Sequence, residues 1–272
     1  MSLPQSTLRV AVDLSNPGQF FACCGLLELA HRLWAGAEGW FESGTFFVSR
    51  SGAISELLTP LLENDPLPLS NLSNGLPVKP IIAPLRLLLR EKPAASIVID
   101  AWLRVGTNAG QPVVMGNPPW NFWSGQQTSS GIWKLLAAAA RKQLGKVQPD
   151  ELENLFEFRV LLSGRFGFDP GAAWNARDVG FSPNAQGMEV ATSPFVELLA
   201  AVGVQRFRPC MARDRQSFNY AAWRFPLEAD VAASFASGIL GGDIERYRGR
   251  VVSRGQYAAL GRSTPLLGDR NE

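Results

Sequence analysis

The stretch LRVAVDLSNPGQFFACCGLLELAHRLW (8–34) decides the fold class of this chain. Its first residues alternate and are rich in Val and Leu, which is typical of a β-strand. The turn that follows interrupts this pattern, and there Ser15 or Asn16 can cap a helix while Pro17 suits a first helical turn. The apolar residues after the turn line one face of a helix. The stretch therefore predicts a strand, a cap and a helix in direct succession.

The rest of the chain continues this mixture of strands and helices. Strands are expected at 8–14, 40–50, 96–104 and 220–227; helices at 20–34, 51–64 with a break at Pro60, 131–146, 193–204 and 229–240; and a hairpin or long strand at 245–260. Residues 105–131, rich in Gly, Asn, Pro, Ser and Gln, predict a long polar loop of the kind that often carries function. The order predicts an α+β fold with a mixed, mainly antiparallel sheet, packed helices and long functional loops.

A polar stretch at 147–158 suggests a boundary between two lobes. Residues 1–146 would form an N-terminal α/β lobe that carries the polar loop, and residues 147–272 a C-terminal, Arg-rich α+β lobe. Because strands and helices recur on both sides of the boundary, one continuous domain is the alternative.

The composition predicts a globular protein with a thin charged surface. Of 272 residues, 46% are hydrophobic and 18% are charged, which is below the usual share of roughly 25%. A net charge of +2 does not by itself indicate a nucleic-acid partner. Of the 26 basic residues, however, 21 are Arg. The planar guanidinium suits phosphates and guanine edges, although a GC-rich genome would produce the same bias.

The residues suited to acid–base and metal chemistry are few. His31 is the only histidine, which excludes a His-rich metal centre and a multi-His nuclease. Cys23, Cys24 and Cys210 lack metal-ligand spacing and suggest reduced thiols in a cytoplasm. The start of the chain does not resemble a secretory signal, and no apolar run approaches the roughly 18 residues of a membrane span. We therefore expect a soluble, cytoplasmic protein without a cofactor, a metal ion or a membrane contact.

The densest basic stretch lies near the end of the chain. Residues 206–272 contain 11 Arg and seven acidic residues. In an extended RFR or RYRGR segment every Arg lies on one face, and such a row can follow a nucleic-acid backbone. The candidate phosphate contacts are Arg206, Arg208, Arg213, Arg215, Arg246, Arg248, Arg250 and Arg254. A solvated face balanced by nearby carboxylates is the alternative interpretation.

Two motifs in the polar loop suggest different functions. GNPPW (116–120) resembles the Asn-Pro-Pro-aromatic turn with which amino-methyltransferases hold a target amine. Such an enzyme also needs a Gly-rich loop after its first strand to hold S-adenosylmethionine, and none follows residues 8–14. The second motif, NFWSGQQTSSGIWKLL (121–136), places amide side chains before a helix start that can attract phosphate. Its candidate nucleic-acid contacts are Asn121, Gln126, Gln127 and Lys134.

Several stretches, in the same order along nearly the whole chain, resemble one family. They are NPGQFFACCGLLELAHRL (16–33), FWSGQQTSSGIWKLL (122–136), SPFVELLAAVGVQRFRP (193–209), YAAWRFPL (220–227) and VVSRGQYAALGRSTPL (251–266). They resemble CRISPR-associated proteins of the type I-U systems, also called I-G or Dpsyc. The most similar group is the large-subunit-like component of the Cascade surveillance complex.

This resemblance implies a non-catalytic role in antiviral defence. Such a subunit sits near the 5′ end of the CRISPR RNA within a ribonucleoprotein. It contacts CRISPR RNA and target double-stranded DNA, assists recognition of the protospacer-adjacent motif (PAM), and prepares the site for a helicase-nuclease recruited in trans. Base pairing then selects the target sequence, while protein reads the short motif and the backbone. The other Cascade subunits are the expected protein partners. The alternatives are the methyltransferase and a pure protein scaffold of the same complex.

Overall fold

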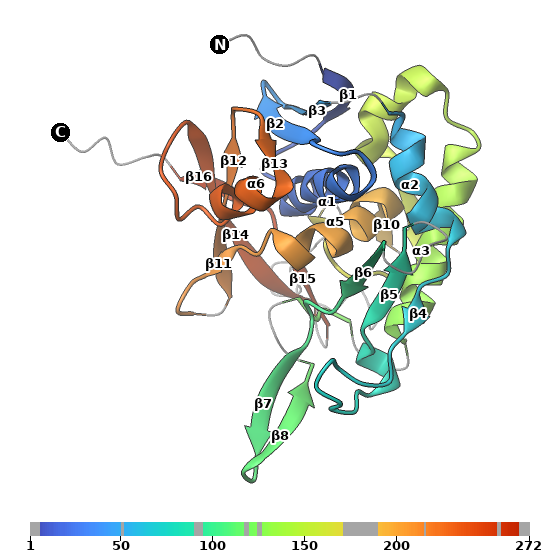
Figure 1. Ribbon diagram of the computed structural model, residues 1–272, viewed down its shortest axis with the longest axis vertical. Helices are drawn as coiled ribbons and strands as arrows, with labels where there is room; N and C mark the ends of the chain where they lie inside the picture. Colours follow the sequence, from blue (N-terminus) through green and yellow to red (C-terminus); the bar gives the residue numbers. More distant parts are fainter. Residues whose placement is uncertain are drawn as a thin grey trace, which may run out of the picture.

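The computed structural model describes residues 6–49, 52–89, 95–116, 120–123, 127–170, 190–214, 216–254 and 257–266. Two helices lie at the centre of the fold, α1 (Pro17–Leu33) and α5 (Pro194–Arg206) (Figure 1). Residues 17–30 of α1 and 194–204 of α5 are all buried. A helix that is apolar around its whole circumference belongs inside a protein. Sheets and outer helices therefore have to cover this pair on several sides.

The predicted cap of α1 is confirmed at Asn16. Its side-chain oxygen accepts a hydrogen bond from the Gln19 backbone N–H at 3.1 Å, and Pro17 occupies the first turn. The Asn16 amide also donates to Asp169 at 3.3 Å. The cap therefore joins the start of the first central helix to a segment that precedes the second.

We expect Asn16→Ala to lower the free energy of unfolding by about 1–2 kcal/mol, because the buried Gln19 N–H loses its acceptor. Asn16→Ser restores an acceptor at the cap without the amide donor to Asp169, so it should recover part of that loss. Urea denaturation of both variants measures the two contributions. Equal losses in the two variants would show that the capping bond contributes nothing.

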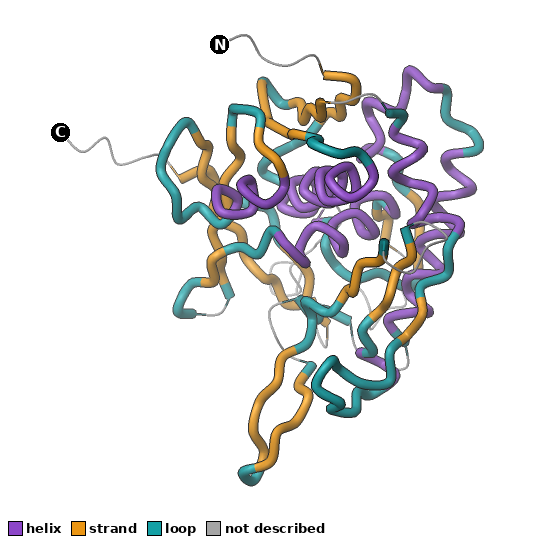
Figure 2. The backbone as a smooth tube through the Cα atoms, viewed as in Figure 1, coloured by secondary structure: helices purple, strands orange, loops and turns teal. Residues whose placement is uncertain are grey.

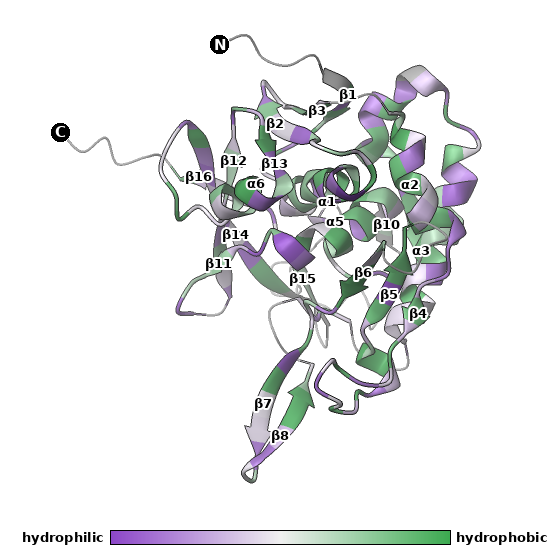
Figure 3. Cartoon of the chain, viewed as in Figure 1, coloured by the Kyte–Doolittle hydropathy of each residue, from purple (hydrophilic) through white to green (hydrophobic). Residues whose placement is uncertain are grey.

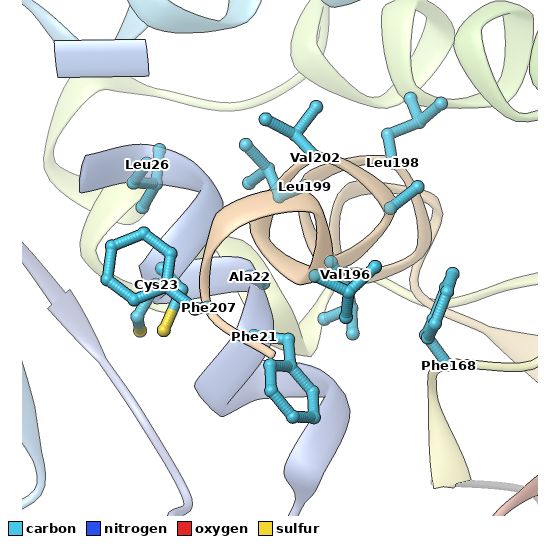
Figure 4. Packing of buried hydrophobic residues seen from close by; sticks show 14 of the residues in the cluster. Phe21, Ala22, Cys23, Leu26, Phe168, Val196, Leu198, Leu199, Val202 and Phe207 are labelled. Atoms are coloured by element: carbon cyan, nitrogen blue, oxygen red, sulfur yellow. The ribbon is translucent and has the colours of Figure 1, made fainter. Parts of the chain in front are cut away.

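Small residues let the two central helices cross in close contact. A Cβ on Gly25 would lie 2.0 Å from the Leu199 carbonyl oxygen, and one on Gly203 would lie 2.1 Å from the Phe21 carbonyl oxygen. Neither backbone could remain in place if these glycines carried a side chain. Figure 4 shows the apolar side chains around the crossing, including Phe21 on α1 and Leu199 and Val202 on α5.

Antiparallel sheets flank the helix pair (Figures 1 and 2). The first has the order β1 (Ser6–Ala11), β3 (Thr45–Ser49), β2 (Glu38–Glu42), β13 (Leu227–Glu228). The second has the order β11 (Cys210–Met211), β12 (Ser217–Trp223), β14 (Ile244–Arg254), β15 (Tyr257–Leu260), and β16 (Thr264–Leu266) also pairs with β14. Rings of β12 pack on α1, since Phe20 lies 4.6 Å from Tyr220 between ring centroids.

The remaining strands and helices lie around the central helix pair and the two sheets. The strands are β4 (Leu67–Pro68), β5 (Leu85–Leu88) and β6 (Ser96–Ile99) in one sheet, β9 (Val160–Leu162) with β10 (Val190–Thr192), and β7 (Arg104–Asn108) with β8 (Gln111–Met115). The helices are α2 (Ile54–Glu63), α3 (Ser129–Leu144), α6 (Ala229–Ala236) and the 3₁₀ helices η1 (Pro80–Ile82) and η2 (Pro149–Glu157). Figure 3 shows hydrophilic and hydrophobic residues alternating around α2 and α3, as expected of outer helices.

The described part of the chain is an α+β fold in which the named strands pair antiparallel, as the sequence predicts. The two predicted lobes share one core. Helix α1 crosses α5, and β13 pairs with β2 through Leu227 and Gly39. Buried residues from both sides of the polar stretch at 147–158 belong to one contiguous hydrophobic cluster.

Four local predictions are wrong. The strand expected at 96–104 ends at Ile99, and a turn at Ala101 and Trp102 separates it from β7. Residues 40–50 are one expected strand, but they turn at Ser43 and Gly44, whose φ angles of 50° and 76° allow a tight hairpin between β2 and β3. Helix α2 continues through Pro60. The loop expected at 105–131 contains the hairpin β7–β8, which turns at Ala109-Gly110 and projects from the body (Figures 1 and 2).

Candidate nucleic-acid interface

Three of the predicted arginines lie on one face of strand β14. Arg246, Arg248 and Arg250 alternate with Tyr247 and Gly249, which are buried on the opposite face. The alternation follows from the two-residue period of an extended strand. We call the side that carries these three residues the arginine face.

The buried side of β14 fixes which way the arginines point. Tyr247 stacks on Tyr220 at 5.5 Å between ring centroids. A Cβ on Gly249 would lie 2.4 Å from the Phe218 ring, so the strand rests directly on that ring. Because a one-residue slip would bury the guanidinium groups against these rings, the register holds the arginines outward.

The three arginines differ in how far they are engaged. Arg246 donates to the carbonyl oxygens of Gly238 at 3.5 Å and Leu240 at 3.1 Å, in the segment after α6. Arg248 and Arg250 are exposed. Arg248 donates to the Ser217 hydroxyl at 3.3 Å, and no carboxylate of the described residues lies within ion-pair distance of Arg248 or Arg250. These two guanidinium groups therefore keep most of their donors open to solvent.

Asp214 lies in the turn beside this face. The Ser217 hydroxyl and the backbone N–H groups of Gln216 and Ser217 donate to it, at 2.7, 2.9 and 2.9 Å. These hydrogen bonds, with a smaller contribution from Arg248, lower the pKa of the Asp214 carboxyl. Its negative charge is therefore held by the turn and offsets only part of the local positive charge.

The other arginines near the sheet are placed differently. Arg208 is exposed after α5, where its Nε donates to the Gln205 carbonyl at 3.2 Å. Arg213 is exposed in the turn between β11 and β12. Arg215 and the side chain of Arg254 lie outside the described residues, although the backbone of Arg254 ends β14.

Arg206 is half-buried and pairs with carboxylates of its own fold. Its guanidinium pairs with Glu28, which is 2% exposed, and with Asp230. The hydrogen bond with Glu28 raises the pKa of Arg206. Glu28 also pairs with Arg32 at 2.6 Å, so the two arginines share this buried carboxylate, and Arg206 links α5 to α1. The sequence could not separate Arg206 from Arg208, because both flank Phe207 in the same RFR segment.

The candidates in the polar loop lie apart from the arginine face. Lys134 pairs with Asp65 at 2.9 Å on α3, which Figure 1 places on the other side of the helix pair from β14. Gln127 donates to the Ser163 carbonyl at 3.3 Å, and the Asn121 amide donates to the Gly116 carbonyl. Gln126 lies outside the described residues. The described loop residues thus bond to their own fold.

The aromatic residue of the GNPPW motif is part of the core. Trp120 is 4% exposed and packs edge-on against Phe218 at 5.4 Å and Phe21 at 6.0 Å between ring centroids. Stacking on a target base would require this ring to leave the core. The described strands also pair antiparallel, whereas the dinucleotide-type fold binds ligand at a parallel sheet. The methyltransferase interpretation therefore gains no support.

The sequence did not indicate a polar groove of about 690 Å³ beside the opposite face of β14. Arg224 pairs there with Glu245, and Arg262 pairs with Asp13 nearby. The hydrogen bond from Arg224 lowers the pKa of Glu245. These groups come from distant parts of the chain, so only the fold brings them together. Their charges neutralise one another in pairs.

Within the described ranges, no three His, Cys, Asp or Glu side chains are arranged to hold a metal ion. None of the helices described is both long and apolar enough to span a bilayer. No protein-family model, curated protein or solved structure matches the chain.

Proposed function

We propose that the protein is a non-catalytic, nucleic-acid-binding subunit of a type I-U CRISPR surveillance complex. It would contact CRISPR RNA and target DNA, assist PAM recognition, and work with a helicase-nuclease recruited in trans. The observation that carries the proposal is the pair of open guanidinium groups on the arginine face, Arg248 and Arg250. The resemblance in the sequence supplies the complex in which that face would act.

The chemistry of this face suits phosphate. A guanidinium presents several donors in a rigid plane and stays charged, so it can hold two phosphate oxygens at once. Arg213 adds a third exposed guanidinium at the neighbouring turn. Such contacts position a nucleic acid and carry no base sequence by themselves, which agrees with a complex whose specificity comes from base pairing.

The test is co-purification from cells that express the tagged chain, its genomic neighbours and a CRISPR array. We expect the wild-type chain to recover one short RNA species with repeat-derived ends, together with partner subunits. The double variant Arg248→Glu/Arg250→Glu should recover at least about tenfold less RNA per protein, because two phosphate contacts become repulsive. Sequencing and quantification of the RNA measure both results.

The matched control is Arg86→Glu/Arg141→Glu, which changes the net charge equally at exposed positions on β5 and α3. It should leave the RNA yield unchanged. Undiminished RNA with the β14 double variant would favour the scaffold alternative. A wild-type chain that purifies alone and free of nucleic acid would contradict the proposal.

A further inference from the structure

The geometry of the arginine face points to one class of ligand. We infer that it binds a single nucleic-acid strand by its sugar–phosphate backbone and does not read the bases. This inference rests on the proposed function and names the ligand of the same site. RNA and DNA strands share this backbone chemistry.

The spacing of the arginines supports an extended strand. Side chains on one face of a β-strand repeat every two residues, or about 6.6–6.8 Å. Arg246, Arg248 and Arg250 thus form a straight row of about 13–14 Å along β14. Successive phosphates of an extended strand lie at a comparable separation. A duplex would bring a second backbone across a groove, and a single row of arginines contacts only one backbone.

Among the described side chains, no exposed aromatic ring lies beside the row. Proteins that hold single-stranded bases usually stack them on exposed aromatic rings. Here the rings of Phe218, Tyr220 and Tyr247 point to the buried face, and Trp223, on the arginine-face side of β12, is fully buried. By register, Ser217 and Asn219 on β12 and Thr264 on β16 share the face with Arg248 and Arg250. Contact is therefore directed to phosphate and sugar.

The hydrogen bonds around the row show how it is held. Arg246 is anchored to the carbonyls of Gly238 and Leu240, and Arg248 rests on the Ser217 hydroxyl. Arg250 lies at the end of the row away from Arg246, where its backbone is opposite Ser217 of β12. The guanidinium group of Arg246 is thus fixed to the segment after α6, while those of Arg248 and Arg250 present N–H donors to solvent. We expect these two residues to make the phosphate contacts that salt can displace.

The experiment measures fluorescence anisotropy of the purified full-length chain with labelled 12-mers of uridine, adenosine and thymidine, and with a mixed duplex of equal length. The single strands should bind within about tenfold of one another, and more tightly than the duplex. Arg248→Gln/Arg250→Gln should reduce the slope of log K against log salt by about 1.4, because each single-strand contact contributes about 0.7. The Arg86→Gln/Arg141→Gln pair should leave the slope unchanged.

Four results would overturn the inference. They are the absence of binding at low salt, tighter binding of the duplex, a preference above about a hundredfold among the single strands, or a change in slope below about 0.7. These outcomes are separate from those of the co-purification. A chain that recovers no CRISPR RNA or partners from cells but binds all three single strands would contradict the proposed complex and leave this inference standing.

Discussion

Gly25→Val will strongly destabilise the protein, because the crossing of α1 and α5 has no room for a side chain. A Cβ at this position would lie 2.0 Å from the Leu199 carbonyl oxygen and 2.8 Å from its carbon. These are backbone atoms, so no rotamer change relieves the overlap, and the helices must separate. Since both helices are buried along nearly their whole length, separation would disturb packing on every side. We expect a loss of at least about 3 kcal/mol, a large share of ordinary domain stability.

Gly203→Ala tests the same crossing from the other helix. Its Cβ would meet the Phe21 carbonyl oxygen at 2.1 Å and the Gly25 backbone nitrogen at 2.8 Å. Gly241→Ala is the matched control, since nothing lies within 4 Å of a Cβ there. Urea denaturation should show that both crossing variants are severely destabilised and that the control changes by less than about 0.5 kcal/mol. If Gly25→Val and Gly241→Ala were equally stable, the close crossing would be disproved.

The central helix was predictable because its signals are local. Asn16, Pro17 and the apolar run that follows are adjacent in the chain, and each has a known role at a helix start. The α+β class followed from segments with the two-residue hydrophobic period of strands and segments with the 3.6-residue period of helices. The hairpins at Ser43-Gly44 and Ala109-Gly110 were missed, because both turns need positive φ at a non-glycine residue, which is an uncommon backbone conformation.

The candidate site was only partly predictable for a related reason. The alternation in RYRGR placed Arg246, Arg248 and Arg250 on one face, and the structure has that arrangement. Periodicity cannot show which guanidinium groups find a partner. Arg206 meets Glu28, which is 178 positions away, and no local pattern encodes that contact. Lys134 likewise meets Asp65 through the packing of α3.

The second large effect is expected at Glu197, a fully buried carboxylate on α5. Its two oxygens accept hydrogen bonds from the backbone N–H groups of Gly167 and Asp169, each at 2.9 Å. Asp169 in turn accepts from Arg159 at 2.9 Å and from the Ser193 N–H at 2.9 Å. Glu197→Ala would leave two buried N–H groups without an acceptor, so we expect a loss of about 3–5 kcal/mol. Glu197→Gln keeps one acceptor oxygen and should cost about 1–3 kcal/mol near neutral pH.

The same residue gives stability a pH dependence whose sign is fixed by burial. Burial raises the pKa of Glu197 above its ordinary value of 4.5, and the nearby Asp169 charge adds to the rise, while hydrogen bonds and Arg165 oppose it. Because the folded state binds this proton more tightly than the unfolded chain, the contribution of Glu197 to the free energy of unfolding is largest below pH 4.5 and falls as pH rises through the folded-state pKa.

The variant Glu197→Gln isolates this effect, because glutamine cannot titrate. The difference in unfolding free energy, wild type minus Glu197→Gln, should therefore decrease as pH rises from about 4.5 and then level off. Urea titrations of both proteins across this range measure the difference, and a constant or rising value would show that burial does not raise the pKa of Glu197.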